Sequence, residues 1–168
     1  MKLQPSTRER LERLWYPIVR DFELRSGDYQ AKIVVRDTRT GRVGTVIHEF
    51  EVPPLDQLRV STPVLSDTRV TGTSPDGHPG GPLAVLARRD FAQGSALYCR
   101  FEVFGAKKDE KTGMPRVTQG YVVNGPDGGV FAAMEPSVIN PTSLGQVTRM
   151  FGFPLENARQ GNYEIVMA

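Results

Sequence analysis

Residues 22–52 read FELRSGDYQAKIVVRDTRTGRVGTVIHEFEV, and this stretch decides the fold expected for the chain. In its first half, apolar side chains alternate with polar ones, which is the two-residue period of a half-buried strand. The apolar positions are Tyr29, Ala31, Ile33 and Val35. Residues 37–41 then have turn composition, and a second apolar face follows at Val46, Phe50 and Val52. The sequence therefore predicts a β-hairpin over residues 28–52.

The opening of this stretch recurs near the other end of the chain. Seven residues repeat in the same order, with three additional residues before the glycine in the second copy. The first copy is Phe22, Leu24, Gly27, Asp28, Tyr29, Ala31 and Ile33, and the second is Phe153, Leu155, Gly161, Asn162, Tyr163, Ile165 and Met167. A tyrosine two residues after a glycine, at the start of a strand, is typical of the tyrosine corner of immunoglobulin-like sandwiches. We therefore predict structural tyrosine corners at Leu24, Gly27 and Tyr29 and at Leu155, Gly161 and Tyr163.

The rest of the chain is divided by glycine and proline into short segments. A short helix is expected over residues 7–16, and residues 144–150 could form one further helical turn. Strands are expected over residues 58–63, 64–70, 83–91, 96–104, 117–123, 130–134 and 162–168. Short strands at this spacing, without long helical patterns, predict an all-β fold. We expect an immunoglobulin-like or fibronectin type III-like antiparallel β-sandwich with a short N-terminal helix.

Only the first copy of the repeat is succeeded by a closing strand, and this asymmetry predicts the domain organisation. Residues 1–54 are interpreted as a helix plus hairpin that ends a preceding sandwich repeat, and residues 55–168 as a sandwich that lacks its last strand. A lone hairpin is marginal in water, and an incomplete sandwich exposes an edge that templates pairing. We expect the hairpin to dock on a sandwich core, in this chain or a neighbour, by strand addition. The expected contact edge is Val43, Val46, His48, Phe50, Val52, Ile165 and Met167.

Composition excludes several classes of function. The chain has 168 residues, a formal charge of +2 and 39% apolar residues, as in ordinary globular proteins. Basic residues are not clustered with aromatics, so no nucleic acid is expected as a partner. No apolar run reaches the roughly 20 residues of a membrane span. The single cysteine, Cys99, excludes an internal disulfide and a cysteine-based zinc site, and it is expected to be buried. No metal or cofactor is expected.

Candidate catalytic residues are few. The two histidines are His48, in the hairpin, and His78, in a glycine-rich loop, and neither has a second histidine beside it in the sequence. Four acidic residues could be considered as paired carboxylates for glycoside hydrolysis. They are Asp109, Glu110, Asp127 and Glu135. Because these acidic residues fall on predicted loops and turns, we do not expect an enzyme.

A carbohydrate-binding module is the alternative function. Tyr98 and Tyr121 fall on predicted strands, and sandwiches often present exposed aromatic rings to sugars. Two exposed, coplanar rings on one sheet face would favour sugar binding. Rings buried between the sheets or under the N-terminal segment would favour an interaction module.

Four segments carry a resemblance to a known family. GDYQAKIVVRD with TGRVG, and later ARRDF with YCRFEVFG, resemble the region downstream of the von Willebrand factor A-like domain in bacterial, especially acidobacterial, proteins. The likeness extends from Trp15 onward. The Asp-x-Ser-x-Ser metal motif of the preceding domain is absent here, so metal-dependent adhesion is not carried over.

The resemblance implies a function and a location. It implies export, an accessory or scaffold role, and a chain cut at both ends from a longer one. On this basis we expect a non-catalytic, extracytoplasmic module that contacts protein, either a second copy of itself or a neighbouring domain.

Overall fold

The computed structural model describes residues 4–14, 18, 20, 22–69, 83–86 and 88–168. Nine strands and one helix are assigned within these residues. The helix is α1 (Pro5–Leu14), and the strands are β1 (Gly27–Arg36), β2 (Val43–Val52), β3 (Arg59–Val60), β4 (Val64–Ser66), β5 (Ala96–Phe104), β6 (Val117–Asn124), β7 (Val130–Ile139), β8 (Val147–Pro154) and β9 (Glu164–Met167). Every strand pairing between them is antiparallel. The predicted all-β sandwich with a short N-terminal helix is confirmed.

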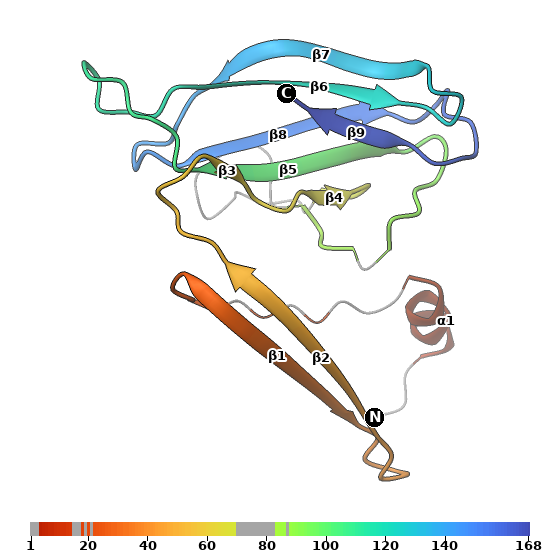
Figure 1. Ribbon diagram of the computed structural model, residues 1–168. Coiled ribbons are helices and arrows are strands. Elements are labelled where there is room, and N and C mark those ends of the chain that lie inside the picture. Colours follow the sequence, from red (N-terminus) through yellow and green to blue (C-terminus); the bar gives the residue numbers. More distant parts are fainter. Residues whose placement is uncertain (1–3, 15–17, 19, 21, 70–82, 87) are drawn as a thin grey trace.

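Two sheets form the sandwich. In one sheet, β3 and β4 pair with one edge of β5, and β8 pairs with the other. The second sheet has the order β7-β6-β9. Figure 1 shows these sheets stacked on each other, with the β1–β2 hairpin as a third, separate sheet below them.

The core lies between the two stacked sheets. β5 alternates strictly between buried and half-buried residues, because successive side chains of a strand point to opposite faces. Phe101 is 2% exposed and Val123 of β6 is fully buried. Removing such a side chain from water stabilises a fold by roughly 1.5–3 kcal/mol. Across the core, Phe151 of β8 stacks on Tyr121 with 4.1 Å between ring centroids.

Several sequence predictions differ from the structure. β7 extends to Ile139 instead of ending at residue 134, and β3 and β4 cover only Arg59–Val60 and Val64–Ser66 of the expected strands 58–63 and 64–70. α1 begins at Pro5 rather than Thr7, since proline suits the first position of a helix, and the expected residues 15 and 16 lie outside the described part. Residues 144–150 form no helical turn, because β8 starts at Val147. Of the expected strand 83–91, Leu83 makes an isolated bridge to Arg69, and the other described residues of that range belong to no strand. The loop that carries His78 also lies outside the described residues.

Candidate interaction site

The second tyrosine corner joins β8 to β9. Leu155 is buried behind the end of β8, and the Tyr163 hydroxyl donates a hydrogen bond to the carbonyl of Arg159 at 3.0 Å. Gly161 has φ = +154°, a conformation that side-chain-bearing residues rarely adopt. The Tyr163 ring packs edge-on against Phe131 of β7, with 5.2 Å between centroids. The corner therefore fixes the direction in which β9 enters its sheet.

The first copy has the same local geometry. The Tyr29 hydroxyl donates to the carbonyl of Arg25 at 2.8 Å, and Gly27 has φ = +148°. In both copies the acceptor is an arginine four residues before the tyrosine, a match between Arg25 and Arg159 that sequence reasoning missed. The environments differ, because Leu24 is 41% exposed and the Tyr29 ring stacks on Phe50 of β2 rather than entering a core. The two copies thus share a backbone motif, and only the second lies within a sandwich.

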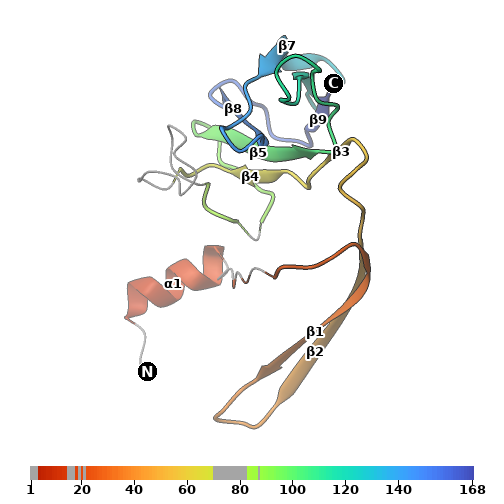
Figure 2. The same ribbon diagram turned by 90° about the vertical axis from the view of Figure 1, so that its left-hand side faces the viewer.

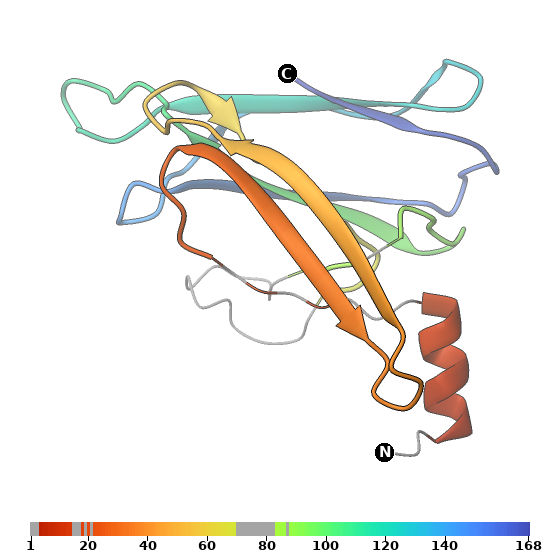
Figure 3. The ribbon, with the colours of Figure 1, turned by 60° about the horizontal axis from the view of Figure 1, so that its bottom comes forward.

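The hairpin is a separate arm. β1 and β2 pair along their whole length, from Gly27 opposite Val52 to Arg36 opposite Val43. They pack on each other, and neither packs closely on any strand of the sandwich. Figure 2 shows the hairpin running away from the two stacked sheets, and Figure 3 shows it crossing beneath them on the side where α1 lies. The expectation that the hairpin docks on a sandwich core is therefore not met within this chain.

One face of the hairpin is apolar and largely uncovered. This face carries Tyr29, Ala31, Ile33 and Val35 of β1 and Val46, His48, Phe50 and Val52 of β2. Phe50 and Val52 are half-buried, but Ile33 and Val46 are 56% and 60% exposed. His48 stacks on Phe50 with 5.9 Å between ring centroids. Val43, which we predicted in the same contact set, lies an odd number of residues before Val46 on the same strand. Its side chain therefore points to the opposite face of the hairpin.

The sandwich has an open side next to β9. A cavity of about 920 Å³ lies there, between the end of the sheet that contains β5 and β8 and the free edge of the β7-β6-β9 sheet. Leu97, Cys99, Val123, Phe153, Ile165 and Met167 line its apolar part. Arg89, Asp90 and Phe91 line it on the side of the segment before β5. The structure thus brings Ile165 and Met167 of the predicted contact set to this opening, while the hairpin members of that set lie on the arm.

The backbone of β9 has one paired and one unpaired edge. Gly120 of β6 and Ala168 exchange both backbone hydrogen bonds, at 2.8 and 3.1 Å. Backbone N–H and C=O groups alternate in direction along a strand. The backbone groups of Glu164 and Val166 therefore also point to β6, and the backbone groups of Ile165 and Met167 point away from it. No described strand pairs with this outward edge. Ile165 and Met167 therefore present backbone donors and acceptors to solvent and side chains to the cavity.

The alternative sites are less well formed. Tyr121, one of the two candidate sugar-binding aromatics, is 8% exposed and stacked in the core. Tyr98 is half-buried, with the Arg69 guanidinium 5.5 Å from its ring centroid. The two tyrosines therefore do not form an exposed, coplanar pair.

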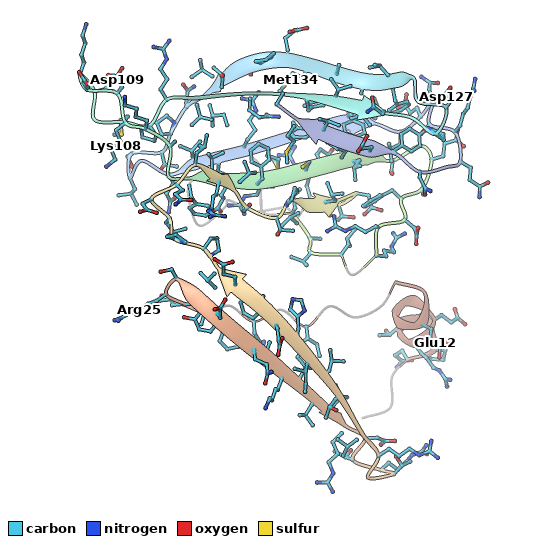
Figure 4. All side chains as sticks on the ribbon, in the orientation of Figure 1. Glu12, Arg25, Lys108, Asp109, Asp127 and Met134 are labelled. Atoms are coloured by element: carbon cyan, nitrogen blue, oxygen red, sulfur yellow. The ribbon has the colours of Figure 1, made fainter. Side chains whose placement is uncertain are left out.

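The candidate carboxylates do not gather at one site. Asp109 and Glu110 lie in the connection between β5 and β6, Asp127 lies in the turn between β6 and β7, and Glu135 lies on β7. Figure 4 shows Asp109 and Asp127 at opposite ends of the sandwich. Asp109 accepts hydrogen bonds from its own turn, and Asp127 accepts one from the Gly129 amide of its turn. Within the described residues, no group of three or more His, Cys, Asp or Glu side chains is placed to hold a metal ion.

Cys99 is buried as predicted, with 1% of its surface exposed. Removal from water raises the pKa of its thiol to about 11, although the nearby Arg89 charge acts in the opposite direction. A thiol with so high a pKa is a poor nucleophile near neutral pH.

Fold and site define a β-sandwich with one open side and a projecting, apolar-faced hairpin. No protein-family model, curated protein or solved structure matches the chain. No helix in the described part of the chain has the length and apolarity that crossing a membrane requires.

Proposed function

We propose that this chain is a non-catalytic interaction module that contacts protein, or assembles with itself, by strand complementation. The observation that carries the proposal is the coexistence of an unpaired β9 edge beside an apolar cavity and an apolar hairpin face that the chain's own sandwich does not cover. Unpaired edges recruit strands, and exposed apolar patches mark contact surfaces. The apolar cavity beside β9 and the apolar face of the hairpin can therefore bury each other.

The strand order supports a fibronectin type III-like interpretation. In such a sandwich the three-stranded sheet β7-β6-β9 would continue with a further strand beyond β9, and the cavity lies where the inward side chains of that strand would point. The resemblance to the region downstream of von Willebrand factor A-like domains supports a scaffold role in an exported bacterial protein.

The proposal is tested by measuring the mass of the full chain in solution over a range of concentrations. Val46→Asp places a charge on the apolar hairpin face, where burial without a partner is costly. We expect it to weaken association at least about tenfold, the equivalent of 1.4 kcal/mol. Thr45→Asp is the matched control, because it adds the same charge one residue away on the opposite face.

Hydrogen exchange provides the second readout. In an assembled protein the hairpin amides should be protected, and Val46→Asp should remove that protection. A chain that stays monomeric at every concentration, with hairpin amides that exchange as fast as a free peptide, would overturn the proposal.

A further inference from the structure

We propose that the strand completing the sandwich beside β9 is β2 of a second copy of this chain, donated by opening the β1–β2 hairpin. The inference rests on the proposed function and makes it specific, because it names the partner, the strand and the register. Phe50 of the donor would lie opposite Tyr163, His48 opposite Ile165, and Val46 opposite Met167.

The register follows from the equivalence of β1 and β9. Tyr29, Ala31 and Ile33 of the first copy correspond to Tyr163, Ile165 and Met167 of the second. In the hairpin, the partners of the first three are Phe50, His48 and Val46. The chain therefore already contains a strand that pairs with a β9-like sequence, and β9 itself has no such partner among the described strands.

The directions of the backbone groups agree with this equivalence. In the hairpin, the Asp37 amide donates to the Arg42 carbonyl at 2.9 Å, so by alternation Ile33, Ala31 and Tyr29 direct their backbone groups to β2. The corresponding residues of β9 direct theirs to the open edge. The edge that β1 uses to hold β2 is thus the edge that β9 leaves unpaired.

The same alternation disfavours antiparallel addition of a closed hairpin through the outer edge of β2. The outer edge of β2 belongs to Ile47, Glu49 and Glu51, because the intervening residues already face β1. Antiparallel pairing of that edge with β9 would direct these side chains, including two carboxylates, toward the apolar cavity. Only release of β2 from β1 allows an antiparallel pairing that directs Val46, His48 and Phe50 inward.

Opening the hairpin requires little free energy compared with the free energy that docking of β2 releases. A two-stranded hairpin is marginal in water, and its side chains are exposed or half-buried. At the new position Phe50 would join the aromatic cluster of Tyr163, Phe131 and Phe153. Donor and acceptor surfaces differ, so the contact closes into a dimer when it is reciprocal and otherwise extends along a row of copies.

One pair opposes the exchange and gives a sharp test. In the hairpin, Gln30 donates a side-chain hydrogen bond to Glu49 at 2.9 Å. Glu164 takes the place of Gln30 in β9, so the exchanged strand would set two carboxylates opposite each other, which is unfavourable. Glu164→Gln should therefore tighten self-association, by up to about fivefold. Glu135→Gln on β7 removes the same charge two strands away and should leave association unchanged.

Disulfide trapping tests the register directly. A hydrogen-bonded antiparallel pair has Cα atoms about 5.5 Å apart, within disulfide reach. Val46→Cys and Met167→Cys chains, one of them isotopically labelled, are mixed and oxidised. We expect a mixed disulfide between them. The control is Phe50→Cys with Met167→Cys, which lies four residues out of register, or about 13 Å. A parallel arrangement would favour this second pair instead and would overturn the inference.

Locking the hairpin tests whether it must open. Gln30→Cys with Glu49→Cys in one chain joins two residues that lie directly opposite each other. The oxidised chain should remain monomeric, and reduction should restore association. If the locked chain still associates, strand exchange is wrong and the proposed interaction role survives. If neither the locked nor the wild-type chain associates, the self-assembly on which the inference rests fails as well.

Discussion

At the scale of single residues, Gly27 and Gly161 have the same backbone conformation in two different surroundings. Both have positive φ, but an added Cβ would lie 3.9 Å from the nearest atom at Gly27 and 2.5 Å from Pro126 at Gly161. Backbone strain alone costs about 1–3 kcal/mol. We predict that Gly161→Ala lowers the stability of the sandwich by at least that amount, because the contact with Pro126 adds to the strain.

The matched variant is Gly27→Ala. It strains only the hairpin, which does not pack on the sandwich, so the midpoint of sandwich unfolding at low protein concentration should not move. Urea unfolding of the two variants measures both effects. Equal losses of stability would contradict the separation of arm and sandwich.

The Cys99 thiol couples stability to alkaline pH. Burial raises its pKa from 9.0 to about 11, so the folded state holds the thiol proton more tightly than the unfolded chain does. The contribution of this protonated thiol to the free energy of unfolding is therefore complete below pH 9.0, and it is lost as the pH rises toward about 11. Since each pKa unit corresponds to about 1.4 kcal/mol, we predict a loss of up to about 3 kcal/mol over this interval. Urea unfolding at several pH values measures it, and the slope should disappear in Cys99→Ala. An unchanged slope in that variant would assign the effect to other groups.

At the scale of elements, one turn motif is used twice. Asp37 accepts hydrogen bonds from the amides of Arg39 and Thr40, and Asp109 does the same with Lys111 and Thr112. Each motif ends in a glycine of positive φ, at +73° in the hairpin and +67° in the sandwich. The sequence Asp-x-x-Thr-Gly therefore determines the turn conformation at both places.

The hairpin turn should depend on acidic pH. The hydrogen bond from the Thr40 hydroxyl, followed by those from the Arg39 and Thr40 amides, lowers the pKa of Asp37 below 3.8. Its contribution to turn stability is therefore complete above that value and is lost as the pH falls through the lower, folded-state pKa. The chemical shift of the Thr40 amide proton should titrate with a midpoint below 3.8, and Asp37→Asn should abolish the titration. A midpoint above 3.8 would mean that these hydrogen bonds do not form in solution.

Sequence periodicity predicted some elements and not others, for physical reasons. β5 alternates strictly between buried and half-buried residues, and the two hairpin strands carry an apolar face with a two-residue period, so these strands were predictable to within a residue or two. In β8, Val147, Met150 and Phe151 have helical spacing, but Val147, Phe151 and Phe153 are the buried residues, with the period of a strand. β7 continues through Pro136 because the β6–β7 register shifts between Gln119 and Tyr121, and proline is tolerated at such irregularities.

The candidate site was predictable only in part. The repeat identified Tyr29 and Tyr163, and the apolar alternation identified Val46, Phe50 and Ile165. The cavity beside β9 was not predictable, because its walls come from segments that are distant in sequence, such as Phe91, Leu97 and Val123. The outward direction of the β9 backbone was also hidden, since it depends on which residues β6 engages.

At the scale of the whole molecule, assembly and stability should be linked. If β2 of a second copy fills the cavity, the associated state is stabilised by mass action, and the unfolding temperature must rise with protein concentration. For a chain of this size each kcal/mol corresponds to about 2–4 °C. We therefore predict a rise of about 5 °C over a hundredfold increase in concentration, measured by calorimetry.

Two variants separate this linkage from other concentration effects. Val46→Asp should flatten the dependence, because the charge would have to enter the cavity beside Met167. Glu164→Gln should shift the whole curve to lower concentration, because it removes the one like-charge pair that opposes docking. Unfolding temperatures that do not change with concentration in the wild-type chain would show that the open side of the sandwich stays unfilled by other copies.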